Sequence, residues 1–204
     1  MFGLKFEYRK TASAVLLFGI IQWILVVMLA EGVQPNYISS IHYVSSLGTG
    51  KTAFFYNFST ILLGICITVG SILIRKAFSL RAFFILFLIS GLATVGVGVF
   101  PEDSRPMHGI VTPIALIFGA KSAMLSYKIQ NKPASYFCIV LGIVSLITGL
   151  GFIPYLGLSV ESRVTYFGFY KGTLERIVIY TNLLWVLILG SQLSINYDNK
   201  KILD

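Results

Sequence analysis

Six apolar stretches constrain this chain more than any other feature, because each approaches the roughly 20 residues that a helix needs to cross a bilayer. Inside lipid the backbone must satisfy its own hydrogen bonds, and a helix does so within a single segment. Charged residues make up only 12% of the chain and hydrophobic residues 56%, so a soluble globular protein of this composition would have too few charged residues on its surface. The sequence therefore predicts an all-α integral membrane protein.

The turn and charge signals between these stretches predict one membrane domain, residues 1–204, with no soluble domain left over. The first stretch follows three basic residues, as in a signal peptide, but it is too long for one and lacks a small-x-small cleavage pattern before Glu31. We therefore expect a six-helix bundle. The expected helices cover about residues 12–30, 53–74, 81–100, 108–127, 134–154 and 176–195.

The basic residues divide unequally between the two sides that six crossings define. Eleven fall on the side of the termini: Lys5, Arg9, Lys10, Arg75, Lys76, Arg81, Lys121, Lys128, Lys132, Lys200 and Lys201. Five fall on the other side: Lys51, Arg105, Arg163, Lys171 and Arg176. The positive-inside rule then predicts that both termini are cytoplasmic. The net charge of +8 is explained by this topology, so we expect membrane lipids as partners and no nucleic acid.

Two long connections, residues 31–52 and 155–175, lie on the expected outer side, whereas the cytoplasmic connections are short. Long connections in a compact fold tend to carry function, so the outer side is where we expect a site.

Glycines are concentrated in two of the expected helices. Because glycine lets helix backbones approach closely in lipid, we expect the third and fifth helices to be central. These glycines are Gly91, Gly96, Gly98, Gly142, Gly149 and Gly151.

The short outer turn of residues 101–108 brings two carboxylates and an imidazole to the mouth of the bundle. Glu102, Asp103 and His108 could bind a metal, move a proton or hold a cationic headgroup, or they could form a solvated loop that caps the fourth helix. His42 is the only other histidine and falls on the same side. If its segment folds back over the bundle, the four residues could form a metal site.

Haem is not favoured, because paired histidine ligands normally lie within facing membrane helices and His42 lies in a connection. Asn57, near the start of the second helix, either bridges helices or lines a cavity, since a polar group in lipid needs a partner. Glu175 and Arg176 open the sixth helix. Arg176 could hold an anionic ligand or could pair with Glu102 or Asp103 and close the bundle.

Several stretches, in order along the chain, resemble the family of polytopic membrane proteins catalogued as domain of unknown function 998. They are Ser45-Ser46-Leu47-Gly48, Phe55-Tyr56-Asn57-Phe58-Ser59 with Gly64, Gly96-Val97-Gly98-Val99-Phe100-Pro101-Glu102-Asp103 with His108, and Glu175-Arg176. The resemblance implies a six-helix bundle with polar residues on one side, and it implies no activity. It adds weight to one outer site formed by Asn57, Glu102, His108, Glu175 and Arg176.

The leading hypothesis is a multi-pass protein of the cell membrane whose outward-facing pocket binds or processes a lipid headgroup or a small polar ligand. If it is an enzyme, His108 would act as general base or metal ligand, with Glu102 or Asp103 orienting it and Arg176 holding an anion. One alternative is a structural or accessory subunit of a membrane complex. Another is a small transporter, although no buried charge marks a path.

Overall fold

The computed structural model describes residues 2–159 and 161–195 and contains six helices that are long and apolar enough to cross a membrane. The expected all-α six-helix fold is thereby confirmed. The helices are α1 (Phe2–Val33), α2 (Ala53–Ala77), α3 (Arg81–Val99), α4 (Met107–Leu125), α5 (Ala134–Gly151) and α6 (Lys171–Leu193). A two-residue antiparallel hairpin, β1 (Thr165–Tyr166) and β2 (Phe169–Tyr170), precedes α6.

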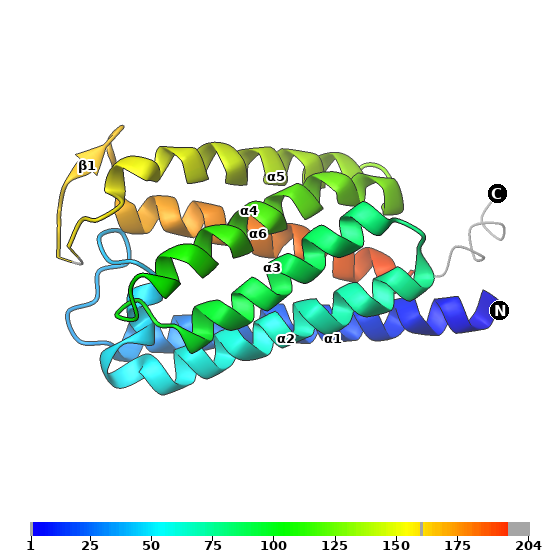
Figure 1. Ribbon diagram of the computed structural model, residues 1–204, viewed down its shortest axis with the longest axis horizontal. Helices are drawn as coiled ribbons and strands as arrows, with labels where there is room; N and C mark the ends of the chain where they lie inside the picture. Colours follow the sequence, from blue (N-terminus) through cyan, green and yellow to red (C-terminus); the bar gives the residue numbers. More distant parts are fainter. Residues whose placement is uncertain (1, 160, 196–204) are drawn as a thin grey trace.

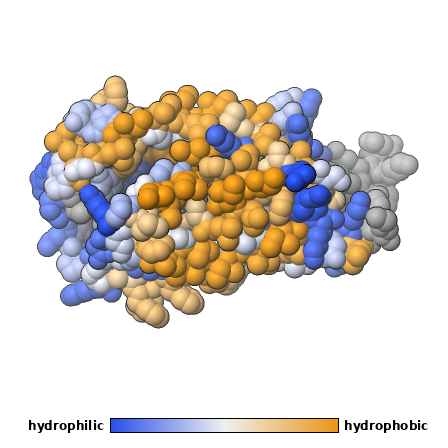
Figure 2. Space-filling view, in the orientation of Figure 1, coloured by the Kyte–Doolittle hydropathy of each residue, from blue (hydrophilic) through white to orange (hydrophobic). Residues whose placement is uncertain are grey.

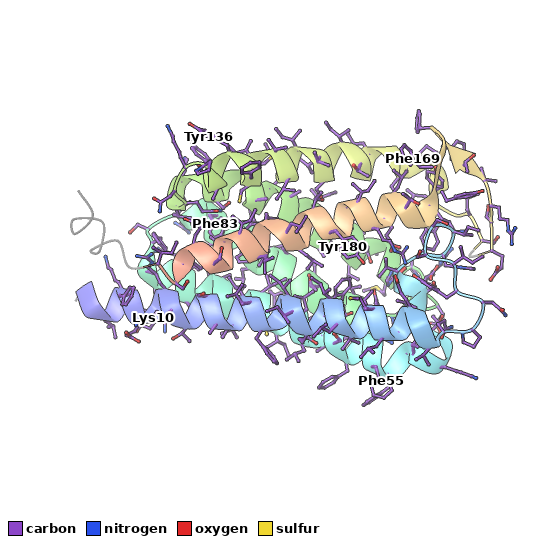
Figure 3. All side chains as sticks on the ribbon, turned by 180° about the vertical axis from the view of Figure 1, so that it is seen from behind. Lys10, Phe55, Phe83, Tyr136, Phe169 and Tyr180 are labelled. Carbon is purple, nitrogen blue, oxygen red and sulfur yellow. The ribbon has the colours of Figure 1, made fainter. Side chains whose placement is uncertain are left out.

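The helices form a ring in which each packs on the next in the chain and α6 returns to α1 (Figure 1). Short connections make consecutive helices antiparallel neighbours. Tyr180 lies on the side of α6 that faces α1, where this ring closes (Figure 3). Since α1 begins and α6 ends at the same end of the bundle, the chain makes an even number of crossings (Figure 1).

The two ends of the bundle differ in structure. We call the end where α1 begins the basic end; its connections, residues 78–80 and 126–133, are short and lie among lysines and arginines. We call the opposite end the loop end; residues 34–52, 100–106, 152–159 and 161–170 gather there (Figure 1). Lys200 and Lys201, which contribute to the predicted charge asymmetry, lie outside the described residues.

Two helices extend beyond their apolar stretches. α1 begins at Phe2 rather than near residue 12, and α6 begins at Lys171 rather than near residue 176. Hydropathy marks only the part of a helix that lies in hydrocarbon, whereas charged turns continue the helix into the interface. The first turns of α1 illustrate this, because Lys10 lies over the ring of Phe6 at 4.4 Å and pairs with Glu7 at 3.7 Å.

The expectation that the third and fifth helices are central is wrong. α2 and α6 are the most buried helices, whereas α5 is the least buried and α3 the next least buried. Gly91 of α3 does allow close packing on α2, because a Cβ there would lie 2.8 Å from the backbone nitrogen of Thr68. Gly149 and Gly151 of α5 have nothing within 4 Å of such a Cβ among the described residues, so they face away from the bundle.

The flanks of the bundle are apolar and its ends are polar. Figure 2 shows a broad hydrophobic belt across the middle, with hydrophilic residues concentrated toward both ends. Large apolar side chains such as Leu29, Phe54 and Phe137 are exposed on the helices, as lipid-facing side chains must be. The belt identifies the direction in which the helices cross the bilayer.

Candidate functional site

The longest connection at the loop end folds back into the bundle. Residues 41–48 are all buried, and Val44 and Leu47 are completely inaccessible. We call this segment the plug. Its second half forms a 3₁₀ turn, Ser45–Gly48, which satisfies part of the buried backbone by local hydrogen bonds such as Leu47 N–H to the Val44 carbonyl at 3.1 Å. The plug therefore covers the loop end from within.

Arg176 fastens the chain that leads into the plug. One guanidinium nitrogen donates to the carbonyls of Ser39, His42 and Gly172, and the other donates to the Glu31 carboxylate at 2.6 Å and to the Tyr37 hydroxyl. Arg176 thus pairs with Glu31 of α1 and not with Glu102 or Asp103. Five acceptors from the chain occupy these two nitrogens, which argues against a role in holding an external anion.

Glu175, the preceding residue, faces the plug from below. Its carboxylate accepts a hydrogen bond from the Val44 backbone N–H and another from the Ser45 side chain. The residue is 7% exposed. Next to it, the Thr173 N–H donates to the Ser40 carbonyl at 3.1 Å. The first turn of α6 therefore holds the plug through both a carboxylate and backbone groups.

Glycine at position 172 permits this contact between α6 and the plug. A Cβ at Gly172 would lie 2.3 Å from the His42 carbonyl oxygen and 2.6 Å from that of Ser39. No side chain fits at that distance from backbone atoms. The close approach is what allows the guanidinium of Arg176, one turn further along α6, to reach the same carbonyls.

Glu102 is buried in the turn between α3 and α4, whereas Asp103 beside it is exposed. Arg105 lies 3.5 Å from the Glu102 carboxylate, yet neither carboxylate oxygen has a hydrogen-bond partner within the described residues. Burial raises the pKa of Glu102, and the positive charges of Arg105 and Lys171 offset part of that rise. The two neighbouring carboxylates therefore occupy different environments.

Lys171 is a buried cation that the sequence analysis placed at the outer side without a role. Its side chain is nearly inaccessible, donates to the carbonyls of Ser159 and Ser162 at 2.8 Å each, and lies 5.2 Å from the centre of the Tyr43 ring. It ties the 152–170 segment over the plug. Its position after an exposed hairpin gives no sequence signal of burial.

The two histidines have separate surroundings. His42 Nδ1 accepts from the Ile38 N–H at 2.8 Å, and its Nε2 lies 3.4 Å from Glu161. His108 Nδ1 donates to the Phe100 carbonyl at 2.8 Å, so a carbonyl orients this ring and not Glu102 or Asp103. The structure does not assemble these four residues into a metal site: across residues 2–159 and 161–195, no group of three or more His, Cys, Asp or Glu is arranged to hold a metal.

Asn57 joins α2 to the plug. Its side-chain nitrogen donates to the Gly48 carbonyl at 2.9 Å, while its oxygen is buried without a partner in the described part of the chain. Ser59, two residues on, exchanges hydrogen bonds with Gln22 of α1 at 2.8 Å and 3.0 Å. Asn57 and Ser59 both bridge segments of the chain. Of the two roles expected for Asn57, bridging or lining a cavity, the structure shows bridging.

A cavity of about 90 Å³ lies inside the ring, below the plug. Its polar end is lined by Glu175, His108, Ser45 and Thr112. The remainder is mostly apolar and reaches an aromatic cluster. In this cluster the ring centres of Phe87 and Trp185 lie 5.1 Å apart, and Phe83 packs on both rings. Phe83 lies toward the basic end (Figure 3). A single water needs roughly 10–15 Å³, so the cavity accommodates several waters or a slender chain.

The structure thus brings together only two of the five residues expected in one outer pocket. Glu175 and His108 line the cavity, whereas Asn57, Glu102 and Arg176 do not. The lining residues that the sequence analysis did not single out include Asn182, Trp185 and Trp23. Asn182 carried a signal, since a polar side chain in the middle of an apolar span marks an interior position. The tryptophans carried none, because a buried aromatic resembles ordinary core.

The fold and its interior define a class: a multi-pass membrane protein built as a ring of six helices closed at one end by a buried plug. The family model described as protein of unknown function (DUF998) matches residues 17–192, from within α1 to the last turn of α6. The chain belongs to this family. No curated protein and no solved structure matches the chain.

Proposed function

We propose that this protein binds an amphiphilic ligand within the ring of helices, with the polar head beneath the plug and an apolar chain directed toward the aromatic cluster. The observation that carries the proposal is the two-part lining of the cavity, polar at Glu175 and His108 and mostly apolar below. Ligand sites combine such an apolar lining with a few placed polar groups. A lipid headgroup or a small polar molecule attached to a hydrocarbon chain fits this arrangement.

The charge of the lining favours a particular kind of head. Its ionisable members are Glu175, His108 and Tyr56, and neither lysine nor arginine lines the cavity in the described structure. The Nδ1 of His108 donates to the Phe100 carbonyl, so Nε2 of the neutral ring is an acceptor, and the Thr112 hydroxyl lies within hydrogen-bond distance of it at 3.2 Å. The Glu175 carboxylate favours a head that donates hydrogen bonds, such as an amine or a hydroxyl, and disfavours a phosphate.

The plug gives the proposed site its cover. Ser45 belongs both to the plug and to the cavity lining, and Glu175 bonds the plug while its side chain lines the same cavity. Arg176 and Lys171 hold the segments on either side of this contact. We place the protein in the cell membrane, with ligand entering at the outer leaflet next to the plug.

Intrinsic fluorescence offers a direct test, because the chain has two tryptophans and both line the cavity. Long-chain primary amines carrying bromine in the chain quench nearby indoles, and we expect them to quench the purified protein saturably. Thr94→Phe fills the cavity and is expected to abolish saturable quenching. Leu92→Phe, on the lipid-facing side of the same helix, is the matched control. Equal quenching of both variants, as annular lipid alone would give, contradicts the proposal.

The accessory-subunit alternative is favoured by one observation, the closed network around Arg176. Its partners all come from the chain itself, and its side chain is 13% exposed. If this network serves only to hold a scaffold, the protein will co-purify with a fixed protein partner in mild detergent, and bromine-labelled amines will not quench saturably. A transport function gains no similar support, since the ionisable lining residues of the described structure are confined to the loop end.

A further inference from the structure

The cavity contains two unpaired polar atoms far from its polar end. Trp185 is 1% exposed, and its indole N–H has no hydrogen-bond partner in residues 2–159 and 161–195. The side-chain oxygen of Asn182 is likewise buried and unpartnered within that part of the chain. Both residues line the cavity. The indole N–H of Trp185 therefore lacks a hydrogen-bond acceptor, and the Asn182 oxygen lacks a donor.

The second tryptophan of the same cavity shows what is unusual here. The Trp23 indole donates to the Thr60 hydroxyl at 3.0 Å, and that hydroxyl donates onward to the Tyr56 carbonyl at 2.9 Å. A buried indole normally finds such a partner, because leaving a donor unpaired in an apolar setting costs about 1–3 kcal/mol. The rest of the Asn182 amide is also engaged: its nitrogen donates to Ser145 and to the Val178 carbonyl.

The positions along α6 define the spacing of the polar groups. Glu175, Asn182 and Trp185 all line the cavity from one helix. At a rise of 1.5 Å per residue, Asn182 lies roughly 10 Å and Trp185 roughly 15 Å below Glu175 along the helix axis. Asn182 and Trp185 are three residues apart and are therefore neighbours on the same face. Both unpaired atoms thus belong to residues on the face of α6 that lines the cavity.

Resting on the proposed function, we infer that the ligand carries a second hydrogen-bonding group in the middle of its chain, placed between Asn182 and Trp185. A hydroxyl meets both requirements, because its oxygen accepts from the Trp185 indole and its hydrogen is donated to the Asn182 oxygen. The ligand class is then an amphiphile with a hydrogen-bond-donating head and a hydroxylated chain. A plain hydrocarbon chain would leave both atoms unpaired.

The test compares two competitors of the bromine-labelled amine on the full chain in detergent: a long-chain primary amine and the same amine with a mid-chain hydroxyl. Recovery of tryptophan fluorescence reports displacement. We expect the hydroxylated amine to compete at an about tenfold lower concentration, which is the net gain expected when the hydroxyl exchanges water for the Trp185 and Asn182 partners. Trp185→Phe keeps an aromatic ring and leaves Trp23 as the reporter, and it should remove most of this preference. Leu92→Phe, on the lipid-facing side of α3, keeps both tryptophans, and as the control it should retain the preference.

The outcomes separate this inference from the function on which it rests. Equal competition by the two amines in the unsubstituted protein means that water fills the middle of the cavity, and it overturns the inference while the amphiphile site stands. Absence of saturable quenching by the labelled amine overturns both. The comparison in the unsubstituted protein needs no variant, so it remains decisive even if Trp185→Phe does not fold.

Discussion

Adjacent residues at the start of α6 have different chemistry. Glu175 points its carboxylate at the Val44 N–H and at the cavity, whereas Arg176 spreads its guanidinium over carbonyls of the segment that leads into the plug. Neighbouring positions on a helix face directions about 100° apart, so a sequence pair of opposite charge need not act as a pair. Here one residue belongs to the proposed site and the other to the structure that covers it.

Arg176→Ala is expected to lower the free energy of unfolding by about 2–3 kcal/mol, because it leaves the half-buried Glu31 carboxylate and several carbonyls without their donor. Arg176→Lys should recover little, since a single ammonium cannot reach acceptors on both sides of the guanidinium. Thermal unfolding in detergent measures both. The control is Arg105→Ala, whose side chain is 56% exposed and whose loss should cost under about 1 kcal/mol. Equal losses of unfolding free energy at both positions would contradict the role of Arg176 in fastening the segment that leads into the plug.

The burial of Glu102 leads us to expect that the stability of the protein depends on pH. Burial raises its pKa in the folded protein, so its charged form opposes folding and its protonated form does not. Glu102→Gln should therefore stabilise the protein relative to the unsubstituted chain above the folded-state pKa. This advantage should shrink as the pH falls through the folded-state pKa toward the ordinary value of 4.5. Unfolding curves between neutral and acidic pH test the trend, with Asp103→Asn as the control for an exposed carboxylate next in the chain. A constant offset at every pH would contradict it.

At the scale of elements, the plug is held by contacts to α1, α2 and α6, and the only regular secondary structure within it is the short 3₁₀ turn Ser45–Gly48. Glu31 supplies the α1 side through Arg176, and Asn57 supplies the α2 side through the Gly48 carbonyl. Tyr43 reaches the 152–170 segment by donating to the Tyr155 carbonyl at 3.3 Å. An irregular segment can lie this deep in a membrane protein only where the protein satisfies its backbone.

Gly172→Ala is expected to push residues 39–42 off α6 and to destabilise the protein by about 1–3 kcal/mol, since the added methyl would overlap three carbonyl oxygens. Proteolysis within the 34–52 segment should become faster at the same time. Gly109→Ala is the matched control, because nothing lies within 4 Å of a Cβ there in the described structure and the helix gains propensity. Similar behaviour of the two variants would show that the close contact at Gly172 is not required.

At the scale of the whole molecule, the ring of helices separates a lipid-facing surface from an interior that contains most of the polar side chains within the spans. Asn182, Ser90 and Thr60 all line the cavity, whereas the outer surface of the belt is apolar (Figure 2). The packing glycines of α3 keep the wall between α2 and α3 tight. A closely packed wall around an internal cavity is the arrangement that the proposed ligand site requires.

The charge asymmetry predicts that the basic end faces the cytoplasm. In a background without Cys66 and Cys138, which are both buried and unpaired with each other, single cysteines report the orientation. Glu161→Cys, at an 85% exposed side chain of the loop end, should react with a membrane-impermeant maleimide on intact cells. Lys132→Cys, at the basic end, should react only after the membrane is opened. The opposite labelling pattern would invert the topology.

The sequence by itself determined the number of helices, their approximate limits and the common end of the two termini, because hydropathy and the length needed to cross a bilayer are local properties. Only the tertiary structure decided which polar residues meet. Arg176 pairs with Glu31, which is 145 positions away in the sequence. Asn182 and Trp185 line the interior because of how α6 is rotated in the ring. Rotation and long-range pairing depend on the packing of all six helices, which no single segment encodes.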